Sequence, residues 1–315
     1  MNDDFLSRFC VPRTTPTEWC SEDPLLIIRP LEIGHDGNPT ANDIFEPWCI
    51  KDAFEGTQIF GAPGSGKTSG SGQAIARSFL HAGFGGLVLT AKVSDRKDWE
   101  NYAAASGRKN SLRIVQKGGG LRYNFLDEAL RDPESAETEN IVEMLMALVE
   151  AAEGGKARAG EDGSFWMRAM KQLLRNAIDL AKHGLNHLSI ELLNDIVGSA
   201  ATSLEQVDSA SWRANSACFA LIEEGRKKLP EMDESSALDF AETEKYWMAK
   251  FPDITPRTRS SIVLTFTTLI DGFLRGTIRD LFCSETTVLE DGRRFSPQIC
   301  LDGDIVIIDL SLKDY

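Results

Sequence analysis

Eight consecutive residues in the first quarter of the chain have the types and spacing of a phosphate-binding loop. Residues 61–68 read GAPGSGKT and match G-x-x-x-x-G-K-[ST] at every fixed position. Glycines let successive backbone N–H groups of such a loop point at one spot, and the positive end of the following helix adds to the attraction for phosphate. The candidate binding residues are Gly61, Ala62, Pro63, Gly64, Ser65, Gly66, Lys67, Thr68 and Ser69.

Two side chains of this loop have separate expected roles. Lys67 should reach the β- and γ-phosphates, and Thr68 should bind Mg²⁺ through its hydroxyl group. The context agrees, because a short buried strand is predicted at Thr57–Phe60 and a helix is predicted directly after the loop. The sequence therefore predicts a site for ATP, or another nucleoside triphosphate, together with Mg²⁺.

The last twelve residues, DIVIIDLSLKDY, raise the question of which acid completes such a site. Four apolar residues, Ile305 to Ile308, run directly into Asp309. In many ATPases a strand of this kind delivers the aspartate that holds the magnesium ion. Leu310 follows, however, where a catalytic glutamate could stand. By pattern alone Asp309 is either the metal-binding acid or a plain strand-end residue.

Composition indicates a soluble globular protein. Of the 315 residues 42% are hydrophobic and 26% are charged, and no stretch of 18 consecutive apolar residues predicts a transmembrane helix. The six cysteines form no close C-x-x-C pair, so we expect reduced thiols and a cytoplasmic location. The net charge of −14 disfavours broad adhesion to DNA or anionic membrane. The basic stretch 108–122 could still be a solvated loop or a strip facing DNA.

Apolar patterning predicts an α/β fold, a P-loop NTPase (RecA-like) parallel sheet with an inserted all-α domain. Strands are predicted at Gly85–Lys92, at Ser111–Gln116 and at the end of the chain. Asp132 and Ser164 are predicted N-caps within the helical insertion. The expected domains are a lead-in at 1–55, a first part of the nucleotide-binding domain at 56–125, the all-α domain at 126–272, and an incomplete return at 273–315.

Several other charged residues have two readings. The pairs Asp127-Glu128 and Asp233-Glu234 do not follow apolar strands, so we expect solvated charges at helix starts. Arg257 and Arg259 open a predicted helix, where they could serve as arginine fingers for a neighbouring subunit or simply cap the helix, pair with acids or face solvent. His183 and His187 are four residues apart, but Gly184 between them argues against a metal site.

Several stretches resemble type IV secretion coupling proteins, the TraG/TraD-like DNA-transfer ATPases of conjugation, which are related to the FtsK and HerA translocases. Residues 60–72, FGAPGSGKTSGSG, are similar to the P-loop of that family. The strand VLTAK ending at Lys92 resembles its second strand, although Thr90 or Ala91 stands where Asp is common. Further stretches that resemble the family, in the same order, are Tyr123–Leu126 (with Phe125 in place of Pro), Phe165-Trp166, and residues 257–282.

This resemblance implies a ring-shaped homo-oligomer that uses ATP to move DNA or protein substrate into a type IV secretion channel. The helical domain would dock relaxosome-type proteins, and secretion-channel proteins would be further partners. Family members usually carry a membrane anchor, which we do not find here, so contact with the inner face of the membrane would come through partners. They also continue to a second apolar strand ending in Asp-Glu. The resemblance therefore favours Asp309 as a strand-end residue and a chain that stops before the hydrolytic acid.

Two other functions remain open. The chain could be a nucleotide-binding adaptor or fragment that recruits partners through its helical domain without hydrolysing ATP, because the Asp-Glu strand is missing. It could also be a chromosomal DNA translocase of the FtsK/HerA type. Whether the chain is an ATPase by itself depends on the supply of a hydrolytic acid.

Overall fold

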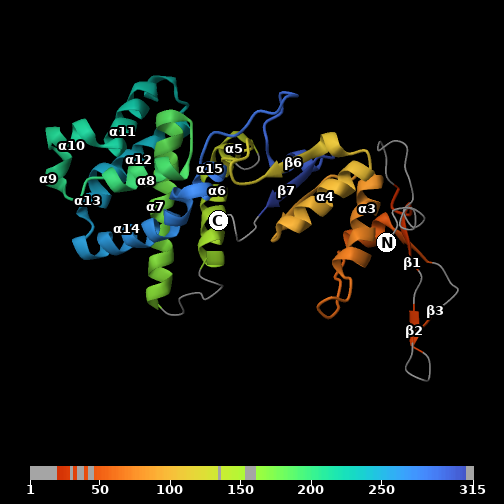
Figure 1. Cartoon of the computed structure of the whole chain (residues 1–315). Coiled ribbons are helices and arrows are strands. Elements are labelled where there is room, and N and C mark those ends of the chain that lie inside the picture. The colour runs from red at the N-terminus through yellow and green to blue at the C-terminus, as the bar shows by residue number, and fades with distance from the viewer. Residues whose placement is uncertain are drawn as a thin grey trace. The chain divides into compact units, whose positions relative to one another are not determined.

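The computed structural model describes residues 20–28, 31–33, 39–41, 46–133, 136–152 and 161–309. The chain divides into two compact units (Figure 1). One unit, the sheet unit, contains the residues up to Leu121 together with those from Pro297 onward. The other, the helical unit, spans Arg122–Ser296. It therefore begins a few residues before the insertion expected at 126–272 and extends beyond it.

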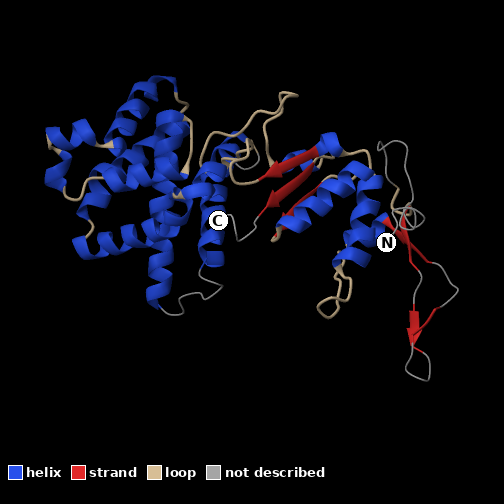
Figure 2. Cartoon of the chain, viewed as in Figure 1, coloured by secondary structure: helices blue, strands red, loops and turns tan. Residues whose placement is uncertain are grey.

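A three-stranded parallel sheet forms the centre of the sheet unit (Figure 2). Its strands are β5 (Gly86–Thr90), β6 (Leu112–Val115) and β7 (Ile305–Asp309), in the order β5-β7-β6. The register pairs Gly86 with Ile305 and Thr90 with Asp309, so β5 and β7 end together. These strands confirm the parallel sheet and the return of the last apolar run. That run is the central strand, which explains why four of its five residues are buried.

Two helices cover one face of this sheet. They are α3 (Gln73–His81) and α4 (Val93–Ala105). Leu80 from α3 and Ala103 from α4 pack with Ile305 of the central strand, and Trp99 of α4 packs against the same cluster. Apolar side chains thus hold α4 on the sheet, and the faces of α4 that point away from the sheet carry polar side chains.

The strand expected directly before the P-loop is not formed. Thr57–Phe60 has no regular secondary structure, and Phe60 is 82% exposed. A parallel strand needs apolar side chains on both faces, and TQIF supplies only Ile59 and Phe60. The prediction of a buried strand at this position was therefore wrong.

The described parts of the lead-in expected at 1–55 are β-rich. Strand β1 (Pro24–Ile28) pairs antiparallel with β4 (Glu46–Cys49), and β2 (Leu31–Ile33) pairs with β3 (Pro39–Ala41). Helix α2 (Ile50–Phe54) follows β4. Leu25 and Ile50 of this region form a small core with Ala82, the residue that follows α3.

In its described residues, the helical unit consists of helices and connecting loops apart from one isolated β-bridge, Val288 with Arg294. Its main core is a cluster built from the apolar stripes of many helices, and Ala201, Val207 and Trp212 form a smaller second cluster. No single helix in the described ranges is long and apolar enough to cross a membrane, although Pro256–Leu274 and Gly276–Phe282, bent by 87°, pass a length and composition test as a pair. The helices are α5 (Phe125–Arg131), α6 (Thr138–Ala152), α7 (Glu161–Leu185), α8 (Ile190–Ser199), α9 (Leu204–Val207), α10 (Ala210–Asn215), α11 (Ala217–Lys228), α12 (Glu234–Lys245), α13 (Phe251–Asp253), α14 (Pro256–Ile270) and α15 (Gly276–Phe282).

Two of the predicted helix starts were wrong. Asp132 ends α5 rather than starting a helix, because Asn124 already caps α5 by accepting the N–H of Asp127. Ser164 lies inside α7, which begins at Glu161. Both errors have the same cause. Asp and Ser are common N-caps, but the residue type alone does not show whether the preceding residues already belong to a helix.

Asp127 is buried, Glu128 is partly buried, and both are paired rather than solvated, which corrects the expectation from the sequence. Asp127 is 3% exposed and contacts Nδ1 of His187 at 2.7 Å and Nε of Arg131 at 2.8 Å. Glu128 accepts from Arg294 at 2.6 Å. Partners 60 and 166 residues away desolvate these carboxylates, so local pattern could not reveal them. By contrast, the exposed Asp233-Glu234 pair does start a helix, with Asp233 as its N-cap.

Asp127 makes the stability of the helical unit dependent on pH. Burial opposes its charge, but the hydrogen bonds from Arg131 and the Leu188 N–H, with the nearby His187, outweigh burial and lower the pKa of Asp127. A lowered carboxyl pKa stabilises the fold fully above the unfolded pKa, which is about 3.9, and this contribution disappears as pH falls through the folded pKa.

We therefore expect Asp127→Asn to lower the free energy of unfolding by about 1–3 kcal/mol at pH 7. The difference from wild type should shrink as the pH falls below about 4. Urea unfolding at pH 7 and pH 3 measures both values. Asp280→Asn, an exposed carboxylate beside Arg279, should change little at either pH. Equal losses for Asp127→Asn at both pH values would contradict this role.

Two helical glycines should respond in opposite ways to alanine. A Cβ at Gly225 of α11 would lie 2.6 Å from Cζ of the buried Phe240 in α12, whereas a Cβ at Gly198 of α8 would meet nothing within 4 Å. Gly225→Ala should cost about 1–3 kcal/mol through overpacking. Gly198→Ala should stabilise by up to about 1 kcal/mol through helix propensity. Thermal and urea unfolding compare the two variants, and a stabilised Gly225→Ala would refute close packing of α11 on α12.

Candidate nucleotide-binding site

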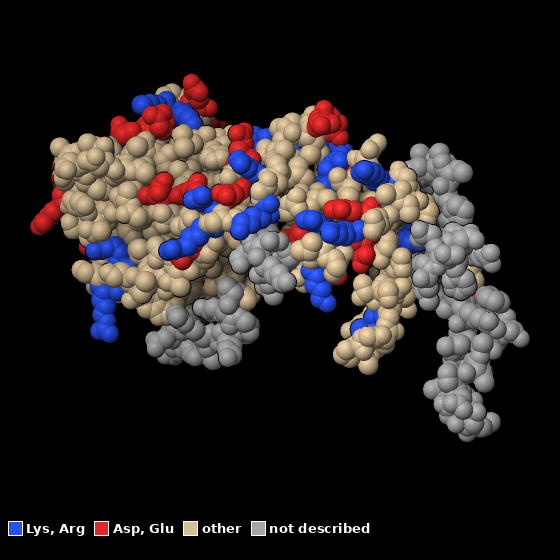
Figure 3. Space-filling view, in the orientation of Figure 1, with Lys and Arg blue, Asp and Glu red and all other residues tan. Residues whose placement is uncertain are grey.

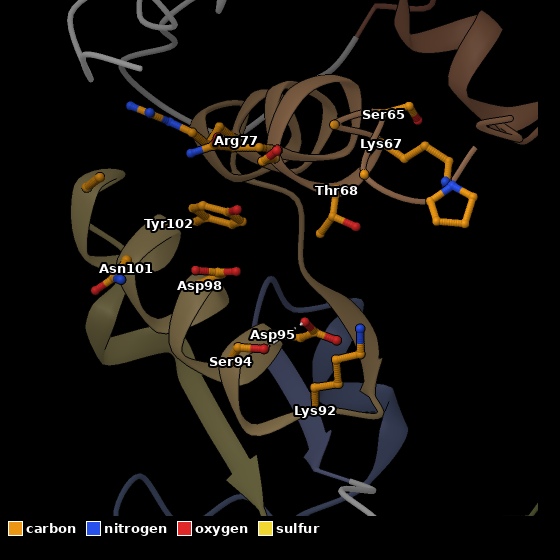
Figure 4. A pocket seen from close by; sticks show the side chains of 16 residues that line it. Ser65, Lys67, Thr68, Arg77, Lys92, Ser94, Asp95, Asp98, Asn101 and Tyr102 are labelled. Atoms are coloured by element: carbon orange, nitrogen blue, oxygen red, sulfur yellow. Dashed lines mark hydrogen bonds between the residues drawn. The ribbon is translucent and has the colours of Figure 1, made fainter. Parts of the chain in front are cut away.

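The P-loop borders a cavity of about 960 Å³ within the sheet unit (Figure 4). This volume suits a small-molecule ligand of nucleotide size. The loop and α3 form one wall, and α4 with the residues before it forms the other. The lining residues are Pro63, Gly64, Ser65, Gly66, Lys67, Thr68, Ser69, Gln73, Arg77, Lys92, Ser94, Asp95, Asp98, Asn101, Tyr102 and Ala105.

Glycine is required at several points of the loop. Gly64 and Gly66 have φ angles of 77° and 83°, in the left-handed region where a side chain would be strained. At Gly61 an added Cβ would collide with the hydroxyl of Ser65. The glycines that the sequence pattern singled out therefore have a direct conformational reason.

Lys67 and Thr68 lie where this loop passes into a helix. The Lys67 ammonium donates to the carbonyls of Gly61 at 2.6 Å and Ala62 at 2.8 Å, so it stays folded over the loop. Thr68–Gly72 form a π-helical turn that continues into α3. The N-terminal end of this helical segment, with its partial positive charge, is thus at the cavity, as expected for an anion-binding loop.

Helix α4 contributes a polar wall that the sequence did not single out. Asp95, Asp98, Tyr102 and Ala105 follow one another at intervals of three, four and three residues, which places them on one helix face. Burial, followed by the charge of Asp98, raises the pKa of Tyr102. A signal was available, because α4 begins just beyond the carboxyl end of β5, the edge where parallel sheets bind ligands.

Lys92 was noted in the sequence only as the end of a family-like strand. The structure places it in the lining of the cavity, two residues after β5 ends. The cavity thus presents three cationic side chains, Lys67, Arg77 and Lys92, as well as the two carboxylates of α4. Charges of both signs around one hollow suit a ligand that combines phosphate groups with a metal ion.

Asp309 is not among the residues that line this cavity. It is 3% exposed at the end of β7, and its carboxylate accepts from Nη1 of Arg96 at 3.0 Å. Arg96 also contacts Gln116 and Glu100. Asp95 and Arg96 are consecutive on α4, so their side chains leave the helix about 100° apart. In the same turn of α4, Asp95 therefore lines the cavity and Arg96 contacts the end of β7.

The remaining candidates lie elsewhere. Arg257 is exposed in the first turn of α14, so its role as an arginine finger stays a prediction. Arg259 is buried and donates to the carbonyls of Pro252 at 3.1 Å and Ile254 at 2.8 Å, which holds the chain that enters α14.

The two histidines contact different residues. Helix α7 continues past Gly184, and His183 packs against Phe240, whereas His187 contacts Asp127. Among the described residues no group of three or more His, Cys, Asp or Glu side chains is placed to hold a metal ion.

The basic stretch 108–122 is divided between internal and exposed side chains. Arg108 contacts the carbonyls of Leu80 and Gly303, and Arg113 pairs with Asp304 at 3.1 Å. Lys109 and Lys117 are exposed. Acidic and basic side chains are interspersed on the face seen in Figure 3. The two arginines therefore connect parts of the sheet unit instead of lying on a solvated loop.

Comparisons with protein-family models, with curated proteins and with solved structures found no match for this chain. The functional argument therefore rests on the residues and geometry of the cavity.

The contact between Arg96 and Asp309 should stabilise the sheet unit. Asp309→Ala leaves the largely buried guanidinium without this carboxylate, and we expect a loss of about 1–3 kcal/mol in the free energy of unfolding. Glu100→Gln removes a more exposed partner of the same arginine and should cost less than about 1 kcal/mol. Urea unfolding of the two variants tests this order. A larger loss for Glu100→Gln would show that Asp309 does not anchor Arg96.

Proposed function

We propose that this chain binds ATP with Mg²⁺ in the cavity beside the P-loop and serves as the ATP-binding part of a coupling-protein-like translocase. The single observation that carries the nucleotide proposal is the loop itself. A complete G-x-x-x-x-G-K-T motif borders a cavity of about 960 Å³, with left-handed glycines at two of its positions.

The residues of the loop have the chemistry that triphosphate binding needs. Backbone N–H groups and the helix end attract phosphate, and Lys67 can exchange its contacts with the loop carbonyls for phosphate oxygens. Thr68 offers a hydroxyl oxygen, the type of donor that magnesium prefers. When bound, the metal ion would neutralise part of the phosphate charge. Arg77 and Lys92 supply further positive charge around the same cavity.

The translocase part of the proposal rests on the order of the family-like stretches and on the connection of the two units. The helical unit is inserted into the sheet unit between Leu121 and Pro297. Such an insertion gives a motor a separate body that can dock partners, here DNA-processing proteins of the relaxosome type, while the sheet unit holds nucleotide. In a ring of identical chains, ATP hydrolysis would be coupled to motion between subunits, and Arg257 could reach a neighbouring site.

A second function is favoured by the position of Asp309. Its carboxylate is held by Arg96 and does not line the cavity. A chain that binds ATP in a cavity without a strand-end acid would hydrolyse it slowly, and it could still recruit partners. This adaptor function uses the same nucleotide site and differs from the motor only in turnover.

The proposal predicts that Lys67→Ala weakens ATP binding by at least about tenfold, because a charge-assisted contact to phosphate is lost. Isothermal titration of the purified 315-residue chain with ATP and Mg²⁺ measures the effect. Lys109→Ala removes an exposed lysine of the same unit outside the cavity and should bind as wild type does. Wild-type affinity in Lys67→Ala would refute the assigned site.

Steady-state turnover separates the motor from the adaptor. ATP hydrolysis by the same chain is measured with and without DNA. Steady hydrolysis that Lys67→Ala abolishes supports the motor. Tight binding of ATP with no hydrolysis under either condition supports the adaptor.

A further inference from the structure

The wall opposite the phosphate-binding loop carries two carboxylates. Asp95 and Asp98 of α4 line the cavity, and Figure 4 shows them across from Thr68. Both are half-buried. Within the part of the chain that the structure describes, neither carboxylate forms an ion pair, although Ser94 Oγ contacts Asp95 at 3.3 Å. Their charges therefore belong to the cavity lining, together with those of Lys67, Arg77 and Lys92.

A triphosphate held by the loop would bring several further negative charges into this cavity. Phosphate oxygens and carboxylates repel one another unless a cation lies between them. Magnesium prefers oxygen donors and is commonly held by one or two carboxylates together with substrate phosphates. The Thr68 hydroxyl on one wall and a carboxylate on the other are donors of that kind. A magnesium ion between the two walls would offset the repulsion between a carboxylate of α4 and the phosphates.

The geometry of α4 distinguishes between the available acids. Asp309 is occupied by Arg96 at 3.0 Å and is absent from the cavity lining. Asp98 lies one turn further along α4, beside Tyr102. The pKa of Tyr102 is raised mainly by burial and then by the charge of Asp98. Asp95 lies in the first turn of α4, close to the carboxyl end of β5.

We propose that Asp95 is the carboxylate that holds the Mg²⁺ of a bound nucleotide opposite Thr68, in the role that sequence pattern offered to Asp309. This inference rests on the proposed nucleotide site. It assigns the metal-binding acid to a helix that follows the first strand of the sheet and not to the end of the central strand.

The test compares ATP affinity in excess Mg²⁺ with ATP affinity in EDTA, by isothermal titration of the whole chain. For wild type we expect binding at least about tenfold tighter with Mg²⁺. For Asp95→Asn this ratio should fall close to one, while affinity in EDTA stays equal or improves because a repelling charge is gone. Asp98→Asn, the same charge change in the same cavity, and Asp309→Asn should both keep a ratio of at least about five.

A second measurement protects the test against misfolding. Circular dichroism checks each variant, and Asp95→Glu, which keeps the carboxylate, should restore part of the metal dependence. Electron paramagnetic resonance of Mn²⁺ counts the ions bound to the protein–ATP complex, and we expect one for wild type and a clear loss for Asp95→Asn.

Each outcome has one meaning. A wild-type ratio in Asp95→Asn, or a lost ratio in Asp309→Asn alone, overturns the assignment to Asp95. Wild-type binding of ATP with no dependence on Mg²⁺ also overturns it but leaves the proposed nucleotide site intact. If wild type binds no ATP in either condition, the proposed function itself fails.

Discussion

The ion pair between Arg96 and Asp309 is the contact on which the arrangement of the sheet unit depends. It joins helix α4 to the end of the central strand at a place where both side chains are largely withdrawn from water. Trp99 and Ala103 pack the same helix on the sheet. With these sides of α4 engaged, the face that carries Asp95 is turned toward the P-loop. The charged end of β7 thus engages one face of α4, while Asp95 on a neighbouring face lines the cavity.

The cavity combines charges in a way that explains its proposed ligand. Backbone N–H groups, a helix end and the side chains of Lys67 and Lys92 attract phosphate, whereas the carboxylates of α4 would repel it. Under the proposed function, these two features together would favour phosphate accompanied by a metal ion over phosphate alone. Folded over its own loop, Lys67 is ready to exchange carbonyl contacts for phosphate contacts without moving far from the loop.

Local sequence signals succeeded where a single segment contains all the information. The Asp233-Glu234 pair was expected at a helix start, and Asp233 does cap a helix there by accepting the N–H of Ser236, three residues later. Signals failed where the outcome depends on distant residues. Asp127 and Glu128 looked like solvated helix-start charges, yet His187 and Arg294 bury and pair them. The short TQIF run resembled a strand, but it has too few apolar residues to pair on the sheet.

The sequence by itself determined the phosphate loop, the strands of the sheet and the presence of a helical insertion, because each shows in the residue types and apolar spacing along its own segment. Glycine at positions 64 and 66 allows the left-handed backbone of the loop, and the apolar run Ile305–Ile308 favours the buried strand β7. Only the tertiary structure decided which acids face the cavity. That choice depends on Arg96, more than 200 residues before Asp309, and on the rotation of α4 about its own axis. Long-range pairing of this kind leaves no periodic trace in the sequence.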